Sequence, residues 1–373
     1  MPGVIDADTH VAEPLEMWDH LDPEWYARRP IVVEVPNDTL YKGSNHMWLI
    51  DGSIFPRSSG RGGSRLVTPT SQDNVKNRPD RRSRELLDLE YRFSDMAATK
   101  VDTHVVYPTL FLAFLTHDPE LEVALARAYN RFMAEVWAKS GGRIRWVVVP
   151  ALRDIDASIA ELRFGKANGA CGIFFRGIEK DRMLDDPYFF PLYEEAQALG
   201  LSVDVHQGQG APALNGLIDI DRSATFTHGR IPPISAFRNI VANRIPELFP
   251  TLRFGFIETG ASWIPFALHQ LKGTMRTDPD FWGPRLFDEY NIWVSYEVDE
   301  DLPYLLKFTG EDHMVAGTDY GHHPGGELNT DRLASDPSAQ FFMVDTLYAR
   351  DDVPKSVIDK MLTDNAAALY GID

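Results

Sequence analysis

The chain has 373 residues, and 37 Lys and Arg against 55 Asp and Glu give it a formal net charge of −18. This charge argues against binding of nucleic-acid phosphates, which requires a concentrated basic surface. The single cysteine, Cys171, excludes an internal disulfide framework and a multi-cysteine zinc site. The composition, 44% hydrophobic and 25% charged, is that of an ordinary globular protein with enough apolar residues to build a core.

The N-terminal residues MPGVIDADTH contain neither the basic nor the apolar stretch of a signal peptide. No run of about 20 apolar residues, the length needed to cross a bilayer, occurs in the chain. We therefore expect a soluble, cytoplasmic protein that does not bind membranes. Its length suits two domains or one large α/β barrel.

A short apolar strand begins at Val4 and leads directly into Asp-Ala-Asp-Thr-His. Residues 18–83 then lose regular periodicity, and the part from 51 to 82 is rich in Ser, Gly, Pro and Arg. Loops of this length inside a compact enzyme are usually either functional lids or disordered segments. We expect 18–83 to be an insertion within a single domain spanning 1–373, serving as a cap over the active site or as an oligomer contact.

Beyond Ser83, helical segments alternate with short, continuous apolar runs typical of parallel strands covered on both faces. Eight strands are predicted, at residues 3–7, 103–107, 144–149, 171–175, 201–205, 253–257, 292–295 and 313–317. The helices between and after them are predicted at 119–139, 154–167, 188–199, 233–244, 262–275, 299–309, 337–347 and 354–369. Eight such alternations predict a (β/α)8 TIM barrel with a long insertion after strand one. An open dinucleotide-binding sheet is disfavoured because no GxGxxG follows the first strand.

Catalytic groups of such barrels project from the C-terminal ends of the strands. The polar residues expected there are Asp8, His10, Arg176, His206, Glu258 and Asp319. Any one of them alone could be a helix cap or a hydrogen-bonded core residue. Together in one barrel mouth, the carboxylates would repel one another without a cation. Imidazole and carboxylate suit Zn²⁺, Mn²⁺ or Fe²⁺, so we expect one or two divalent ions per chain.

Three segments of the chain resemble the amidohydrolase superfamily, and within it the amidohydrolase 2 branch, whose members include aminocarboxymuconate-semialdehyde decarboxylase. They are DADTHVAEP at 6–14, GLSVDVH at 200–206 and GTDYGH at 317–322. The region from 172 to 206 is also similar, and the resemblance covers nearly the whole chain apart from the insertion. The order and combination of motifs indicate the superfamily but not the substrate.

The resemblance implies a role for each matching residue. Asp8 and His10 would be the first pair of metal ligands, and His206 the ligand on strand five. Asp319 would be the strand-eight carboxylate that binds metal and activates water. Strand six departs from the pattern, because the family commonly places a histidine where this chain has Glu258. Glu258 thus offers a further carboxylate for a metal ion or for proton transfer.

Several residues near the mouth are candidate substrate contacts. Arg176 could hold a substrate carboxylate or simply neutralise the acidic mouth. His228 and His322 are predicted to face the substrate. Glu13 could assist a metal-binding histidine or begin the next helix, and both interpretations stay open.

Three functions are compatible with this arrangement. The first is a metal-dependent hydrolase, in which a metal-activated water attacks an ester, thioester or amide, with Asp319 or Glu258 moving the proton. The second is a nonoxidative decarboxylase or hydratase acting on a small aromatic or unsaturated carboxylic acid. The third is a barrel without catalysis that serves binding or assembly, which the intact ligand types disfavour. We favour hydrolysis of a small-molecule substrate, and the family resemblance adds the expectation of a homodimer or higher homo-oligomer.

Overall fold

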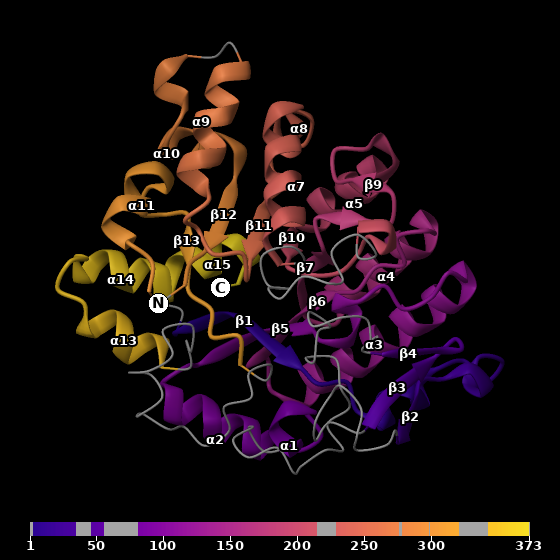
Figure 1. The fold of residues 1–373 in the computed structure, drawn as a ribbon. Coiled ribbons are helices and arrows are strands. Elements are labelled where there is room, and N and C mark those ends of the chain that lie inside the picture. Colours follow the sequence, from indigo (N-terminus) through magenta and orange to yellow (C-terminus); the bar gives the residue numbers. More distant parts are fainter. Residues whose placement is uncertain are drawn as a thin grey trace.

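The computed structural model describes residues 3–34, 46–55, 81–214, 229–275, 278–297, 299–320 and 342–372. Within them, eight parallel strands form one sheet whose spatial order follows the chain (Figure 1). The strands are β1 (Ile5–Val11), β5 (Thr103–Pro108), β6 (Ile144–Val148), β7 (Ala170–Phe175), β10 (Ser202–His206), β11 (Phe254–Ile257), β12 (Ile292–Ser295) and β13 (Met314–Val315). Sequential neighbours joined by helical crossovers are the arrangement predicted from the alternating pattern.

Three backbone hydrogen bonds join the first strand to the segment that follows the last. The amide of Ala7 donates to the carbonyl of Ala316 at 2.9 Å, and the amide of Asp319 donates to the carbonyl of Asp8 at 2.9 Å. The amide of His10 donates to the carbonyl of Tyr320 at 2.6 Å. These bonds close the sheet into a barrel, and the predicted TIM-barrel fold is confirmed.

Helices cover the outside of the barrel and bury their apolar faces against it (Figure 1). They are α2 (Leu89–Thr99), α3 (Pro119–Lys139), α4 (Ile155–Ala167), α5 (Phe190–Leu199), α7 (Ile231–Ala242), α9 (Ile264–Thr274), α11 (Leu302–Thr309) and α15 (Asp364–Tyr370). Shorter helices are α1 (Arg81–Arg84), α8 (Ile245–Leu248), α10 (Pro284–Tyr290), α13 (Met343–Ala349) and α14 (Lys355–Leu362). None of the described helices is long and apolar enough to cross a membrane.

Local sequence sets several helix boundaries. Helix α3 has the predicted bounds because Asp118 caps it, accepting hydrogen bonds from the amides of Glu120 and Leu121, while Pro119 takes the first helical position. The predicted segment at 354–369 is instead two helices, since the backbone leaves the helical region at Thr363 (φ −131°, ψ −76°). Helix α10 was not predicted, because seven residues are too few to show a helical period.

The first strand is longer than predicted. It was expected to end at residue 7, but it continues to Val11 and pairs with β5 as far as Pro108. The register shifts between Asp6 and Thr9, so β1 carries one extra residue relative to β5. Asp8 and His10 therefore lie inside a strand held on both sides, and not in a loop beyond it.

The described parts of the 18–83 insertion include a three-stranded antiparallel sheet of β2 (Ile31–Glu34), β3 (His46–Ile50) and β4 (Ser53–Phe55). The buried ring of Trp48 contacts Trp18 edge to face, with ring centroids 6.3 Å apart. Arg28 bridges Asp51 of this region to Asp118, the cap of α3, at 2.5 and 2.6 Å. The described insertion thus packs on the barrel, while its role as a cap or oligomer contact stays a prediction.

A carboxyl group lies in the barrel interior on the strand that carries His206. Asp204 is fully buried, and its Oδ2 accepts a hydrogen bond from Ser202 at 3.0 Å. The neighbouring strands have glycine beside it, and a Cβ on Gly172 or Gly255 would lie 1.8 or 2.7 Å from the Asp204 oxygens. Burial raises the pKa of Asp204 to about 8, against the smaller lowering effect of the Ser202 hydrogen bond.

Replacing Asp204 by Asn should change how stability depends on pH. In the unfolded chain the pKa of an aspartate is about 3.9, so between roughly pH 4 and 8 the folded protein holds one more proton than the unfolded one. This group therefore lowers the free energy of unfolding by about 1.4 kcal/mol per pH unit as pH rises, until the folded carboxyl also ionises. Urea denaturation between pH 5 and 8 should show a shallower fall for Asp204→Asn. Equal slopes would mean that Asp204 is ionised in the folded protein.

Candidate metal centre

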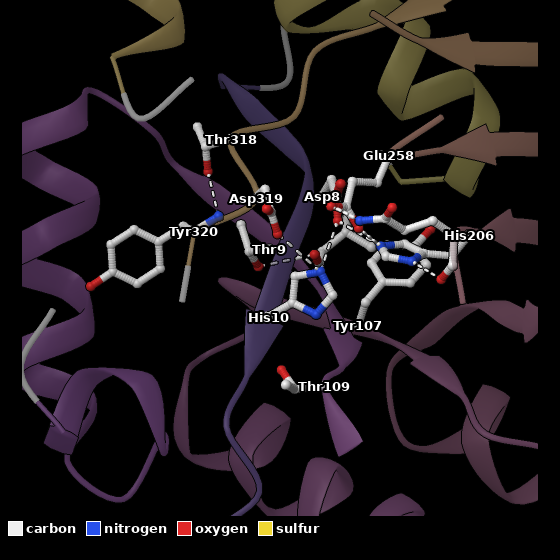
Figure 2. Close-up of polar contacts among 12 residues, drawn as sticks. Asp8, Thr9, His10, Tyr107, Thr109, His206, Glu258, Thr318, Asp319 and Tyr320 are labelled. Carbon is white, nitrogen blue, oxygen red and sulfur yellow. Dashed lines mark hydrogen bonds and ion pairs between the residues drawn. The ribbon is translucent and has the colours of Figure 1, made fainter. Parts of the chain in front are cut away.

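Four side chains converge at the mouth of the barrel. Asp8 and His10 come from β1, His206 ends β10, and Glu258 follows β11 (Figure 2). Each offers one ligand atom, and the four atoms all lie within 4.8 Å of one another. The Nε2 atom of His206 is 3.4 Å from Asp8 Oδ1 and 3.3 Å from Glu258 Oε2. We call these four residues the metal cluster.

Both histidines of the metal cluster are oriented by backbone carbonyls. The Nδ1 atom of His10 is 3.1 Å from the carbonyl of Pro108, and that of His206 is 2.9 Å from the carbonyl of Gln207. A carbonyl only accepts, so each Nδ1 carries a hydrogen, and in the neutral imidazole with that hydrogen the Nε2 lone pair is available. This tautomer is the one that ligates a metal ion through Nε2.

The polar atoms at the centre of the cluster fit a cation. The buried Nε2 of His206 and Oε2 of Glu258 have no hydrogen-bond partner among the described residues. Burial opposes protonation of His206, yet Asp8 and Glu258 together raise its pKa to about 9. Burial, Asp319 and Asp8 raise the pKa of Glu258 well above its usual range. Each shift reflects negative charge crowded in a buried place, which a divalent ion would neutralise.

Asp319 lies beside the metal cluster. Its Oδ1 is 3.2 Å from Nε2 of His10, and its amide donates to the carbonyl of Asp8. It is not one of the four residues whose ligand atoms lie within 4.8 Å of one another. Its roles as a metal ligand and as a proton carrier stay predictions. The structure places its side chain next to His10.

Two residues that carry carboxylates of the site, one after β11 and one after β13, have left-handed backbone conformations. Glu258 has φ +53° and Asp319 has φ +54°. This region costs a residue with a side chain about 1–2 kcal/mol. Such strain persists where the surrounding structure holds it, and it is concentrated at functional sites.

A buried network behind β1 was missed by the sequence analysis. The guanidinium of Arg92, from α2, donates to Nδ1 of His104 at 3.0 Å and to the carbonyl of His10 at 3.3 Å. It also stacks on the ring of Tyr320, 4.3 Å from its centroid. Arg92 lies in an ordinary helical stretch, so nothing in the local sequence distinguishes it from a surface arginine.

Asp6 is a second residue that the sequence analysis missed, and it links β1 to the segment that follows β13. Asp6 accepts hydrogen bonds from the amide of Thr318 at 2.9 Å and from the amide of Asp8 at 3.2 Å. Its other oxygen accepts from the Thr318 hydroxyl. Asp6 stands in the recognised motif, two residues before Asp8, and this alternation was the signal available for it.

Gln207 was also missed, although it directly follows His206. Its side-chain amide donates to Oε1 of Glu258, while its carbonyl accepts from His206. One residue thus positions two members of the metal cluster. Its place at the end of a barrel strand was the signal that could have identified it.

Glu13 does not touch the metal cluster directly. Its carboxylate accepts hydrogen bonds from the amides of Thr109 and Leu110, at 2.8 and 2.9 Å. It therefore holds the segment that directly follows Pro108, the last residue of β5, whose carbonyl is bonded to His10. Burial raises the pKa of Glu13 to about 8, and these backbone hydrogen bonds only partly offset it.

Arg176 is engaged within the protein. Its side chain donates to the carboxylate of Glu179 and to the carbonyls of Phe111 and Ala113, the last at 3.0 Å. A role in binding a substrate carboxylate stays a prediction that requires these bonds to be exchanged. The other two predicted substrate contacts, His228 and His322, lie outside the described residues.

Comparison with known proteins identifies the family. The family model Amidohydro_2, described as Amidohydrolase, matches residues 5–372, and the chain belongs to this family. The resemblance noted in the sequence is confirmed.

Three relatives illustrate the range of similarity. A curated 2-amino-3-carboxymuconate-6-semialdehyde decarboxylase of Dictyostelium discoideum is 25% identical over 257 residues, covering 65% of this chain and 68% of that protein. The crystal structure of an amidohydrolase from Mycobacterium avium subsp. paratuberculosis K-10 has a TM-score of 0.76 at 20% identity and covers 99% of both chains. A 5-carboxyvanillate decarboxylase from Novosphingobium aromaticivorans, complexed with manganese and 4-hydroxy-3-methoxy-5-nitrobenzoic acid, has a TM-score of 0.60 at 18% identity, covering 80% of this chain and 86% of that one.

Removing one imidazole should abolish tight metal binding without unfolding the barrel. We expect His206→Ala to weaken Mn²⁺ binding by at least about 100-fold, because loss of an orienting partner alone commonly costs 10–100-fold. Isothermal titration with Mn²⁺ measures this effect. His117→Ala, at an exposed histidine outside the metal cluster, is the matched control and should bind normally. Unchanged affinity of His206→Ala would show that the metal site lies elsewhere.

The left-handed backbone at Glu258 predicts an unusual order of stabilities. Without metal, Glu258→Gly should be more stable than Glu258→Ala by about 1 kcal/mol, because glycine adopts this conformation without a steric penalty. Both variants lack the carboxylate, so thermal unfolding in EDTA isolates the backbone effect. At Glu195, inside helix α5, the order should reverse, with Ala more stable than Gly. Greater stability of Glu258→Ala would refute a strained backbone.

Proposed function

We propose that this protein is a metal-dependent nonoxidative decarboxylase of a small aromatic or unsaturated carboxylic acid. The observation that carries the proposal is the position of Glu258 in the metal cluster, where Oε2 lies 3.3 Å from Nε2 of His206 and Oε1 is held by the side chain of Gln207. A carboxyl group at this place, in its protonated form, can deliver a proton to carbon, which decarboxylation requires.

The named relatives support this choice over the hydrolysis favoured from sequence alone. The curated relative is a semialdehyde decarboxylase, and the manganese-containing neighbour is a decarboxylase complexed with a benzoic acid. Both therefore support the decarboxylase alternative for this chain.

The proposed reaction assigns one task to each group. A divalent ion held by Asp8, His10 and His206, with Asp319 as the further ligand that the family pattern implies, would supply a Lewis acid that binds and orients the substrate carboxylate. The bond between the carboxylate carbon and the substrate carbon breaks, CO2 leaves, and the electron pair stays on the substrate carbon. Glu258 donates its proton to that carbon, and product release with reprotonation of Glu258 completes the cycle. Gln207 holds the Glu258 carboxyl in position through Oε1.

A small, largely apolar cavity of about 30 Å³ lies near His206, so a substrate ring would need its walls to move apart. The ring of Phe174 lies 6.0 Å from the His206 ring, centroid to centroid, and also lines this pocket. Its other apolar walls include Phe111, Phe114, Leu125 and Leu152. Apolar walls beside a polar centre are the usual anatomy of a small-molecule site.

Glu258→Gln tests the proposed proton donor. With manganese-loaded protein, we expect CO2 release from a panel of hydroxybenzoates and unsaturated carboxylic acids, and a kcat about 10²–10⁴ lower in Glu258→Gln. Metal content of the variant should stay at the wild-type level, because the proposal gives Glu258 the proton and not the ion. Glu195→Gln, at a helix on the outside of the barrel, is the control and should retain full turnover.

The same samples should be offered aryl esters, thioesters and amides. Cleavage of these compounds without CO2 release from any acid would overturn the decarboxylase proposal in favour of hydrolysis. Loss of a metal equivalent in Glu258→Gln would make Glu258 a ligand and leave the proton donor to be found elsewhere.

A further inference from the structure

The cavity near His206 is too narrow for a substrate ring, and its walls favour a different occupant. We call it the small cavity. It measures about 30 Å³, and ten of its thirteen described lining residues are apolar. They belong to helix α3, to strand β7 and to the segments that follow β5 and β6. A space of this size admits one small molecule, since about 10–15 Å³ is enough for one water.

The three polar side chains that line the small cavity already have partners within the protein. They form the pairs Arg176–Glu179, Glu122–Arg153 and Thr116–Asp51. A buried water molecule needs several polar partners, whereas apolar cavities stay dry and take up apolar atoms or molecules. The small cavity therefore suits a small apolar occupant better than it suits water.

The small cavity lies one aromatic ring away from the metal cluster. Phe174 is buried and lines the cavity. Its ring lies 6.0 Å from the ring of His206 and 6.5 Å from the ring of Tyr107, centroid to centroid. A molecule released at the metal cluster therefore has a short path to the small cavity.

The small cavity also adjoins an open cavity of about 310 Å³. Four residues line both cavities: Phe114, Glu122, Leu152 and Arg176. Phe114 is only half-buried, and the guanidinium of Arg153 lies over its ring, 5.4 Å from the centroid. A change of the Phe114 rotamer would open one cavity to the other, and such changes are fast for side chains that are partly exposed.

We propose that the small cavity binds the CO2 that decarboxylation releases, and that CO2 leaves from there through the open cavity. The inference rests on the proposed function and deepens it, because it gives the gaseous product a binding site of its own. CO2 is linear, uncharged and without a net dipole, so it needs no hydrogen-bond partner and is compatible with apolar walls.

Movement of CO2 into the small cavity favours the forward reaction. Once the carbon–carbon bond has broken, the electron pair on the substrate carbon has two possible partners. It attacks the carbon of CO2 and restores the carboxylate, or it takes the proton of Glu258 and forms the product. CO2 that has moved past Phe174 no longer competes with the proton.

Xenon is the first probe, because it binds small apolar cavities and does not require a metal ion. The protein is loaded with zinc, since paramagnetic manganese would broaden the signals. We expect xenon NMR to detect saturable binding, and dissolved CO2 at mildly acidic pH to compete with it.

Ala126→Val fills the small cavity from its α3 wall and should abolish xenon binding. Ala134→Val is the matched control. It makes the same substitution at another buried alanine of α3, which is not one of the described lining residues, and it should bind xenon normally. Val149→Ala enlarges the small cavity and should strengthen xenon binding. Circular dichroism melts of all variants confirm folding.

Turnover of an acid that the protein decarboxylates gives a second readout. In Ala126→Val we expect kcat to fall several-fold and the isotope effect at the carboxyl carbon to rise, because CO2 that cannot move aside recombines with the substrate. Ala134→Val should leave both quantities unchanged.

No xenon binding by the wild type, or equal binding by Ala126→Val, would overturn the inference, and so would xenon binding with which CO2 does not compete. Unchanged kcat and isotope effect in a variant that excludes xenon would also overturn it. CO2 release without xenon binding would reject the CO2 site and retain the proposed function. Competition between xenon and CO2 without decarboxylation of any acid would reject the proposed function and retain a cavity that binds gases.

Discussion

The hydrogen bonds that close the barrel also assemble the site. Strand β1 pairs with β5 on one side and with the segment after β13 on the other, and the residues that make these bonds include the candidate ligands themselves. The carbonyl of Asp8 accepts from the amide of Asp319, and the amide of His10 donates to the carbonyl of Tyr320. Closure of the barrel therefore also brings Asp319 to His10, and a change that opens this junction would separate the two residues.

The carboxylates that meet at the site repel one another when no cation is bound. Hydrogen bonds from the surrounding residues keep the site in position. Arg92 donates a hydrogen bond to the backbone carbonyl of His10, and Asp6 accepts hydrogen bonds from the amides of Asp8 and Thr318. Backbone carbonyls fix both ring orientations, and Gln207 links His206 to Glu258. Left-handed backbones at Glu258 and Asp319 add strain to this arrangement. Backbone strain of this kind lowers the stability of the folded protein, and it is common at sites whose geometry is fixed for catalysis.

The mouth is divided into two chemically different halves around the metal cluster. Beyond His206, Phe174 leads into apolar walls. Beyond Glu258, Arg230 and Glu297 face an open polar cavity.

Much of the fold and of the candidate site could be read from the sequence alone. Buried parallel strands give continuous apolar runs, so the eight alternations predicted the barrel, and the helix predicted at 119–139 has the bounds of α3. Because strand ends of a barrel meet at one mouth, Asp8, His10, His206 and Glu258 could be grouped before any coordinates were known. Their order also indicated the family.

Tertiary structure alone decided how those residues are supported and what surrounds them. The burial of Arg92, the engagement of Arg176 with Glu179 and the pairing of Arg230 with Glu297 depend on segments far apart in the chain or on side-chain direction. These three arginines therefore have three different roles in the folded protein. Sequence periodicity reports which face of an element is apolar, but it carries no information about which distant partner meets a polar side chain. That choice is made by packing, because desolvation and hydrogen-bond geometry act only once the barrel is closed.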